Sequence, residues 1–277
     1  MSFGKVEGFF IDTCILLPHP LETIMKACSD FIKETASQCI LSSSIKKEAL
    51  DLIEQSHNTI LLNFHSKLKP FLTSKGIKKI TNRDGQIFAD FFADQKSLFR
   101  KLPYRKSNIQ YEILGAMESY IASQVHSLKD GQKLPVDIFF AAIAAELAIK
   151  KHELEAPFKG LRCEEIKPSN SLLSAVILGS LLKNSGDAVH LASALEYQFR
   201  NNRWVIFVTT DQHDILDKAS EFKEMFLQCS RPEWALDYYR EMTKVESPLD
   251  YVKNVNDTLT LNQQRVLDAL NLKICTE

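Results

Sequence analysis

The sequence lacks the cysteine spacing of a zinc site or a disulfide framework. The 277 residues include six cysteines, and no two of them form a Cys-x-x-Cys pair. Zinc-binding and disulfide-rich domains depend on closely spaced cysteines, whereas scattered single cysteines are usual in a reducing compartment. The spacing therefore argues against a cysteine-built zinc centre and favours a cytoplasmic protein without disulfides.

A secretory leader and a long hydrophobic segment are also missing. Residues 1–5 do not show the basic stretch followed by an apolar one that begins a signal peptide. The longest apolar runs, at 139–149 and 172–182, are shorter than the roughly 20 residues that cross a bilayer. We therefore expect a soluble protein without a membrane partner.

The chain has no excess of positive charge. It carries 34 Lys and Arg against 35 Asp and Glu, a formal net charge of −1. A balanced protein has no general field that attracts nucleic acid, so such binding would need local basic patches. A glycine-rich phosphate loop and a Ser-His-Asp arrangement are missing as well, which argues against nucleotide-loop and serine-hydrolase chemistry.

What the chain does contain is a set of short apolar runs separated by helical patterns. Runs at 8–12, 38–41 and 204–211 predict buried strands, and a weaker run at 224–229 predicts a last edge strand. Helical spacing dominates elsewhere. We therefore predict an α/β protein with three parts: a discontinuous α/β core (1–58 and 184–230), a helical insertion (59–183) and a helical C-terminal extension (231–277).

Four acidic residues fall at corresponding places in these elements. Asp12 and Asp211 follow predicted strands, Asp187 lies in the first turn of a predicted buried helix, and Glu48 lies near the start of a helix capped by Ser42–Ser44. Taken alone, Asp187 is explained as a helix cap. Taken together, the four acids would meet at the carboxyl ends of a parallel sheet, where ligands bind.

Four converging carboxylates would repel one another without a cation. Ligation by oxygen alone favours a hard ion such as Mg²⁺ or Mn²⁺. Such ions activate water and stabilise attack on a phosphodiester. The hypothesis drawn from the residues is therefore metal-dependent phosphodiester hydrolysis.

Four segments, in this order, resemble the PIN-domain family of metal-dependent nucleases. They read Phe-Phe-Ile-Asp-Thr at 9–13, Ser-Ser-Ile-Lys-Lys-Glu at 43–48, Gly-Asp-Ala-Val-His-Leu-Ala-Ser-Ala at 186–194 and Phe-Val-Thr-Thr-Asp at 207–211. The resemblance implies a Rossmann-like, three-layer α/β/α domain with a central parallel sheet. It also implies an endoribonuclease that uses Mg²⁺ or Mn²⁺.

The resemblance assigns roles to individual residues. It makes Asp12, Glu48, Asp187 and Asp211 the metal-binding, catalytic carboxylates. Thr209 would position the last of these acids, and Thr13 and Asp214 occupy secondary places. Cys14 stands where the family usually has Asn, which predicts a looser hydrogen bond beside Asp12. His190 is interpreted as a packed core residue.

The resemblance covers only residues 8–57 and 185–229. The helical stretch between them could serve substrate recognition or dimerisation. The basic group around Tyr104 fits RNA binding and a solvated helix face equally well; it comprises Arg100, Lys101, Tyr104, Arg105 and Lys106. For Lys67–Arg83 the solvated face is favoured. RNA is the expected partner, and a homodimer or a regulatory partner protein stays open.

Two other functions compete with the nuclease. A haloacid-dehalogenase-type phosphatase also begins with a strand that ends in Asp, but it requires a second Asp two residues on, where this chain has Cys14. A catalytically inactive PIN-like scaffold that binds RNA or a protein would keep the fold without hydrolysis. The presence of all four acids favours the enzyme.

Overall fold

The computed structural model divides the chain into two compact units. The α/β unit comprises Met1–Leu16, Leu21–Glu48 and Gly160–Glu277, and the helical unit comprises Leu17–Pro20 and Ala49–Lys159. The residues whose structure is described are 8–19, 21–99, 104–164, 171–180, 182, 185–242, 246–255 and 258–271.

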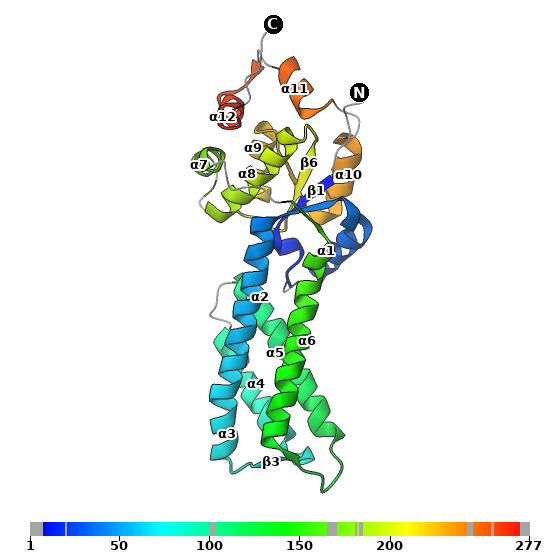
Figure 1. The fold of residues 1–277 in the computed structure, drawn as a ribbon, viewed down its shortest axis with the longest axis vertical. Coiled ribbons are helices and arrows are strands. Elements are labelled where there is room, and N and C mark those ends of the chain that lie inside the picture. The colour runs from blue at the N-terminus through cyan, green and yellow to red at the C-terminus, as the bar shows by residue number, and fades with distance from the viewer. Residues whose placement is uncertain are drawn as a thin grey trace. The chain divides into compact units, whose positions relative to one another are not determined.

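A five-stranded parallel sheet forms the centre of the α/β unit (Figure 1). Its order is β5-β2-β1-β6-β7, so the order reverses between β1 and β6. All residues of β1, β2 and β6 are buried, as expected for parallel strands covered on both faces. The strands are β1 (Gly8–Ile11), β2 (Cys39–Ser42), β5 (Arg162–Glu164), β6 (Val205–Val208) and β7 (Gln228–Ser230).

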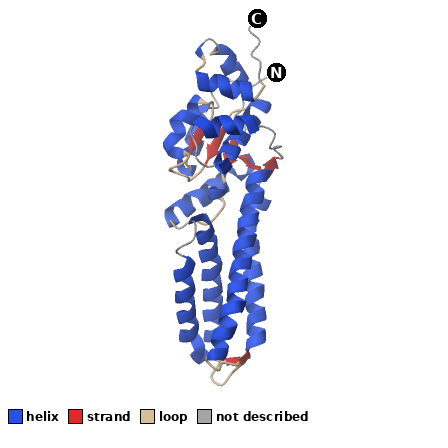
Figure 2. Ribbon diagram, turned by 90° about the vertical axis from the view of Figure 1, so that its left-hand side faces the viewer, coloured by secondary structure: helices blue, strands red, loops and turns tan. Residues whose placement is uncertain are grey.

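Helices surround these strands (Figure 2). Helix α8 contacts both α7 and β6, and α10 contacts both α1 and β6. Most residues of α8 are buried, in agreement with its nearly continuous apolar surface. The predicted α/β class is thus confirmed. The helices of this unit are α1 (Glu22–Thr35), α7 (Ser171–Ser180), α8 (Ser185–Arg200), α9 (Ala219–Glu224), α10 (Pro232–Met242), α11 (Pro248–Asn254) and α12 (Leu261–Ala269).

The helical unit packs its helices around phenylalanine side chains. The rings of Phe64 and Phe140 are 4.8 Å apart, and those of Phe88 and Phe139 are 5.2 Å apart. Among the residues described, no helix combines the length and the hydropathy of a membrane span. Helix α2 (Ser43–Asn63) begins in the α/β unit and enters the helical unit at Ala49. The other elements are the π-helix η3 (Phe64–Leu68), α3 (Lys69–Ser74), β3 (Lys79–Ile80), α4 (Gly85–Phe99), α5 (Tyr104–Ser127), β4 (Leu134–Pro135) and α6 (Val136–Lys159).

The unit boundaries differ from the domain boundaries predicted from the sequence. Helix α2 continues without a break through residue 58, where the α/β core was expected to end. Strand β5 lies inside the predicted insertion 59–183, yet it pairs with β2. Residues 231–277, predicted as a separate extension, belong to the α/β unit. Strand β5 has only three residues, two of them charged, so no apolar run reveals it.

Candidate metal centre

Asp12 and Asp211 flank the point at which the strand order reverses. Asp12 directly follows β1, and Asp211 comes after the neighbouring strand β6. The connections after two such strands lead away in opposite directions and leave a crevice, which is the usual ligand site of an open parallel sheet. The topology therefore brings these two predicted acids to one edge.

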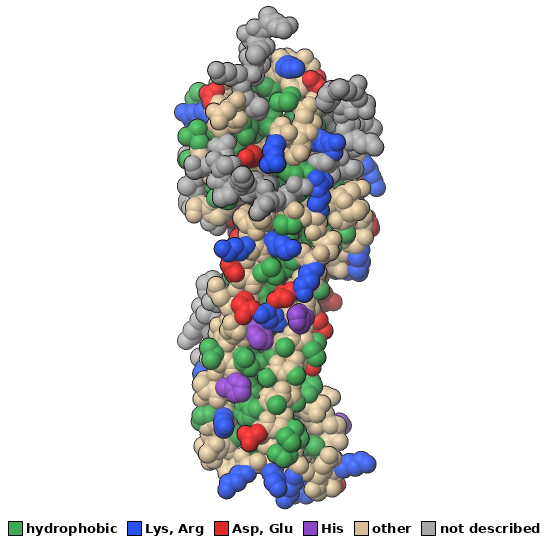
Figure 3. Space-filling view, viewed as in Figure 1, with side chains coloured by type: hydrophobic (Ala, Val, Ile, Leu, Met, Phe, Trp, Pro, Cys, Tyr) green, Lys and Arg blue, Asp and Glu red, His purple; other side chains and the backbone are tan. Residues whose placement is uncertain are grey.

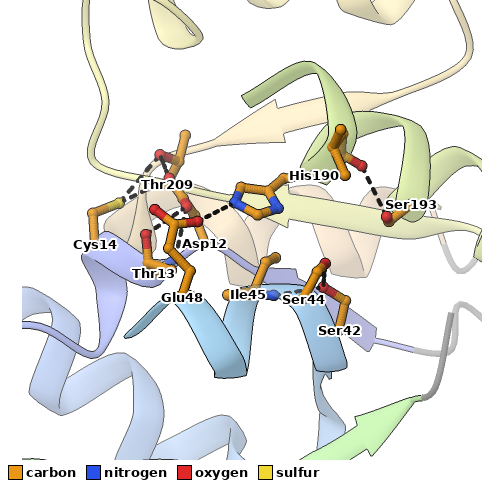
Figure 4. A network of polar contacts seen from close by, with 11 residues as sticks. Asp12, Thr13, Cys14, Ser42, Ser44, Ile45, Glu48, His190, Ser193 and Thr209 are labelled. Atoms are coloured by element: carbon orange, nitrogen blue, oxygen red, sulfur yellow. Dashed lines mark hydrogen bonds and ion pairs between the residues drawn. The ribbon is translucent and has the colours of Figure 1, made fainter. Parts of the chain in front are cut away.

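Asp12 is completely buried and extensively hydrogen-bonded (Figure 4). The backbone N–H of Thr13 donates to Asp12 Oδ1 at 2.6 Å, and the Thr209 hydroxyl donates to Oδ2 at 2.8 Å. Thr209 Oγ1 in turn accepts the backbone N–H of Asp211 at 3.0 Å. Burying a carboxylate is tolerated when donors surround it. These bonds hold the Asp12 side chain in place and connect the ends of β1 and β6.

Asp187, Asp211 and Asp214 form a cluster of three carboxylates. One oxygen from each side chain lies within 4.8 Å of the other two. Asp187 is 2% exposed and sits in the first turn of α8, where the helix dipole favours a negative charge. Asp211 and Asp214 are half-buried in the loop after β6. The backbone N–H of Asp214 donates to Asp211 Oδ1 at 3.1 Å, which folds this loop so that both acids face Asp187.

The three carboxylates fit a small divalent cation. Mg²⁺ holds oxygen ligands at 2.0–2.1 Å, so ligands on opposite sides of it are about 4.2 Å apart. Oxygens within 4.8 Å of one another therefore reach that geometry with small side-chain movements. A donor set made only of carboxylates suits Mg²⁺ or Mn²⁺ better than zinc or copper.

Glu48 contacts His190, an interaction that the sequence analysis did not predict. The two side chains meet at 2.8 Å, between Glu48 Oε2 and His190 Nε2. His190 is buried, and its Nδ1 has no hydrogen-bond partner among the described residues. A carboxylate can only accept, and a buried lone pair without a partner is more common than a buried N–H without one. Nε2 of His190 therefore donates to Glu48 Oε2.

The positions of Glu48 and His190 follow from two helices. Helix α2 begins after Ser42, whose hydroxyl accepts the backbone N–H of Ile45 at 3.2 Å. Because α2 begins there, Glu48 lies close to the carboxyl ends of the strands. In Figure 4 the Glu48 carboxylate points toward the residues after β1. His190 lies three residues after Asp187 on α8, so the two share one face. That spacing is the signal by which His190 could have been found.

Cys14 takes part in the same network. Its Sγ donates to Asp12 Oδ2 at 3.1 Å and accepts the backbone N–H of Thr210 at 3.1 Å. Burial raises the pKa of the Cys14 thiol, and the nearby Asp12 carboxylate raises it further. The thiol therefore stays protonated at neutral pH. Cys14 thus donates to Asp12, where the sequence analysis expected a looser hydrogen bond.

All four predicted carboxylates lie in the α/β unit, and they form two groups. Asp187 and Asp211 share the three-carboxylate cluster with Asp214, which was expected only in a secondary role. Asp12 is joined to this cluster through Thr209, and Glu48 is bonded to His190. Of the predicted RNA-binding residues, Arg100 and Lys101 lie outside the described part of the chain. For Tyr104, Arg105 and Lys106 only the backbone is described, at the start of α5.

The helical unit contains a second charged feature, which we call the basic end. Segments 67–84 and 129–137 carry eight basic and three acidic residues. The β3–β4 ribbon joins these segments, since Lys79 pairs with Pro135 and Ile80 with Leu134. Lys and Arg side chains gather over α3 and β3 in Figure 3. The eight basic residues, all exposed, are Lys67, Lys69, Lys75, Lys78, Lys79, Arg83, Lys129 and Lys133.

The basic end differs from the rest of the helical unit in its lack of ion pairs among the described residues. None of its eight cations forms an ion pair with a described residue. Four other lysines of the unit each contact a glutamate. They are Lys96, Lys150, Lys151 and Lys159.

No protein-family model, no curated protein and no solved structure matches this chain.

Proposed function

We propose that this protein is a divalent-metal-dependent nuclease that hydrolyses phosphodiester bonds, and that it acts as an endoribonuclease of the PIN-domain type. One observation carries the proposal. Asp187, Asp211 and Asp214 bring three carboxylate oxygens within 4.8 Å at the carboxyl edge of a parallel sheet. Hard oxygen ligands of this kind hold the divalent ions that activate water beside a phosphodiester.

The roles of the residues follow from their bonding. Asp187, Asp211 and Asp214 would hold Mg²⁺ or Mn²⁺. The bound ion would lower the pKa of its water ligand and stabilise the negative charge that develops on the phosphodiester. Asp12 is held by Thr13 and Thr209, so its negative charge stays fixed beside the cluster.

Glu48 has a different place in the proposed reaction. Its side chain is 38% exposed, and His190 fixes one of its oxygens. A fixed and partly solvated carboxylate can accept a proton from a water molecule at the strand ends.

The fold supports the family part of the proposal. The sheet is parallel, and its order reverses between the two strands that carry Asp12 and Asp211. This is the arrangement expected of a Rossmann-like nuclease core. The four sequence segments that resemble PIN domains all fall at or near this edge.

A nucleic-acid partner is supported by the basic end. Its eight exposed cations have no acidic partner among the described residues. Phosphate backbones bind such surfaces through release of counterions. We propose RNA as the substrate, in line with the resemblance.

The test is cleavage of labelled RNA and single-stranded DNA by the purified protein, with Mn²⁺, with Mg²⁺ and with EDTA. We expect RNA cleavage only with a divalent ion. Asp187→Asn should lower the rate about 100-fold or more, because it removes a metal ligand and the metal contributes several kcal/mol to the transition state. Asp12→Asn should also lower the rate, because it removes the fixed negative charge beside the cluster. Glu224→Gln, an exposed acid on α9 outside the cluster, is the matched control and should retain full activity.

Circular dichroism of each variant should match that of the wild type. Cleavage that persists in both Asp variants, or in EDTA, would contradict the proposal. RNA binding without hydrolysis under every divalent ion would favour the scaffold alternative instead.

A further inference from the structure

A pocket of about 380 Å³ lies beside β7, the outer strand of the sheet next to β6. It is formed by the loop after β6, α9, the whole of β7 and the first half of α10. Gln212, which directly follows Asp211, lines it. Strand β7 pairs with β6, and the backbone N–H of Thr209 donates to the carbonyl of Ser230 at 3.0 Å. The pocket and the carboxylate cluster therefore share the loop after β6, within one unit of the chain.

The lining of this pocket has the opposite charge to the metal centre. It includes two cations, Lys223 and Arg231, and no acidic residue. Its volume lies in the range of small-molecule sites, roughly 300–1,000 Å³. Gln212 and Gln228 add amide groups that can donate and accept hydrogen bonds. A group that is anionic, planar and polar at its edges fits this chemistry.

Trp234 gives the pocket an aromatic surface. The side chain is 56% exposed, although tryptophan is usually well covered. The guanidinium carbon of Arg231 lies 5.7 Å from the centre of the indole ring. Arg231 Nη2 also donates to Gln212 Oε1, which holds the guanidinium over the ring. Among the described residues Gln212 is the one acceptor of this guanidinium, which has five N–H donors in all.

We propose that this pocket binds one nucleotide of the RNA strand beside the scissile phosphodiester. The base stacks on Trp234, and Arg231 and Lys223 contact its phosphate. Aromatic stacking combined with nearby cations is the usual way to hold single-stranded nucleic acid. The inference rests on the proposed function for the identity of the strand, but the binding step needs neither metal nor catalysis.

The chain offers a direct reporter, because it contains only two tryptophans. Trp204 is half-buried and outside the pocket, with its Nε1 donating to the Glu246 carbonyl at 2.6 Å. In the Trp204→Phe protein, fluorescence comes from Trp234 alone. We expect octauridylate, added in EDTA, to quench this fluorescence to saturation. In the Trp234→Phe protein, where Trp204 is the remaining reporter, quenching should be lost.

Affinity for fluorescein-labelled octauridylate, measured by anisotropy in EDTA, gives the second readout. Trp234→Ala should weaken binding about 5- to 140-fold, which corresponds to the loss of one stacked base. Arg231→Ala should weaken binding as well. Arg240→Ala, which removes an exposed arginine outside the pocket on the helix that carries Trp234, is the matched control and should bind as the wild type does.

These measurements test the proposed nucleotide pocket independently of the proposed nuclease activity. Quenching of Trp234 and weaker binding by Trp234→Ala support the pocket even if no divalent ion gives cleavage, in which case the proposed function fails alone. Unchanged Trp234 fluorescence together with wild-type affinity of Trp234→Ala overturns the pocket, even if Mn²⁺-dependent cleavage is observed.

Discussion

Replacing Asp214 by Asn should stabilise the metal-free protein and weaken its response to metal. The Asp214 carboxylate lies within 4.8 Å of those of Asp187 and Asp211. Three like charges at this distance repel one another when no cation is present. Asparagine keeps the size and shape of the side chain and removes one charge, so the folded state loses a source of repulsion.

The size of the effect follows from the distance. Two unit charges 4.8 Å apart interact by about 0.9 kcal/mol in water and about 3.5 kcal/mol at an effective dielectric constant of 20. Asp214 is half-buried, so solvent and salt screen it and the lower part of this range applies. With two neighbours, the variant should gain about 1–2 kcal/mol in the free energy of unfolding. One kcal/mol corresponds to about 2–4 °C in Tm for a unit of this size.

Metal should reverse the order of stability. A ligand present at 100 times its Kd stabilises the folded state by about 2.7 kcal/mol, and the wild type should show this gain with Mn²⁺. Asp214→Asn, which keeps two of the three carboxylates, should gain less.

Thermal unfolding in EDTA and in Mn²⁺ measures both effects, with Glu224→Gln as the control that should show no reversal. If Asp214→Asn is less stable than the wild type in EDTA, or gains as much from Mn²⁺, the cluster is not a metal site of the kind described.

Three further predictions concern other parts of the chain. The first replaces Lys78, Lys79 and Lys133 of the basic end by Ala. This triple variant should reduce the slope of log affinity for single-stranded RNA against log salt concentration by about 2. The control Lys150→Ala removes an ion-paired lysine and should leave the slope unchanged. Gln110 is fully buried, and neither polar atom of its side chain has a hydrogen-bond partner among the described residues. Gln110→Leu should therefore raise the free energy of unfolding, measured by urea titration, by about 1 kcal/mol or more. A lower free energy of unfolding would contradict this. Iodoacetamide at neutral pH should modify the exposed Cys163 well before Cys14, because burial raises the pKa of the Cys14 thiol and only the thiolate reacts. Peptide mass mapping shows the order of modification. Early modification of Cys14 would contradict its place in a buried hydrogen-bond network.

The central strands could be predicted because buried parallel strands are short apolar runs. Strands β1 and β2 were expected within one residue of their observed bounds, and the run predicted for β6 extends three residues beyond its end. Strand β5 could not be predicted, since Arg162–Glu164 has no apolar run and becomes a strand only by pairing with β2. The boundary between the two units lies inside α2 and could not be predicted either, because the helix is continuous and only tertiary contacts divide it.

The candidate site was predictable where local sequence alone sets the position. Asp12 and Asp211 follow strands, and Asp187 opens a helix, so each has a local signature. The inclusion of Asp214 depends on a backbone turn that no simple pattern records. His190 was expected to be a packed core residue; it is buried, but it also bonds to Glu48, 142 positions away in the sequence. Pairing across that separation is set by how α2 and α8 meet the sheet.

The position of β1 in the middle of the sheet has a consequence for synthesis. One neighbour of β1 is made soon after it, but the other, β6, begins only at residue 205. Until then, an emerging chain presents one edge of β1 with unpaired backbone groups, and such edges template wrong pairing. The intervening helical unit holds its own compact contacts, so its early collapse would shorten the loop that must close. We expect helices to form first and the sheet to close last, with truncated chains that end before residue 205 prone to aggregate.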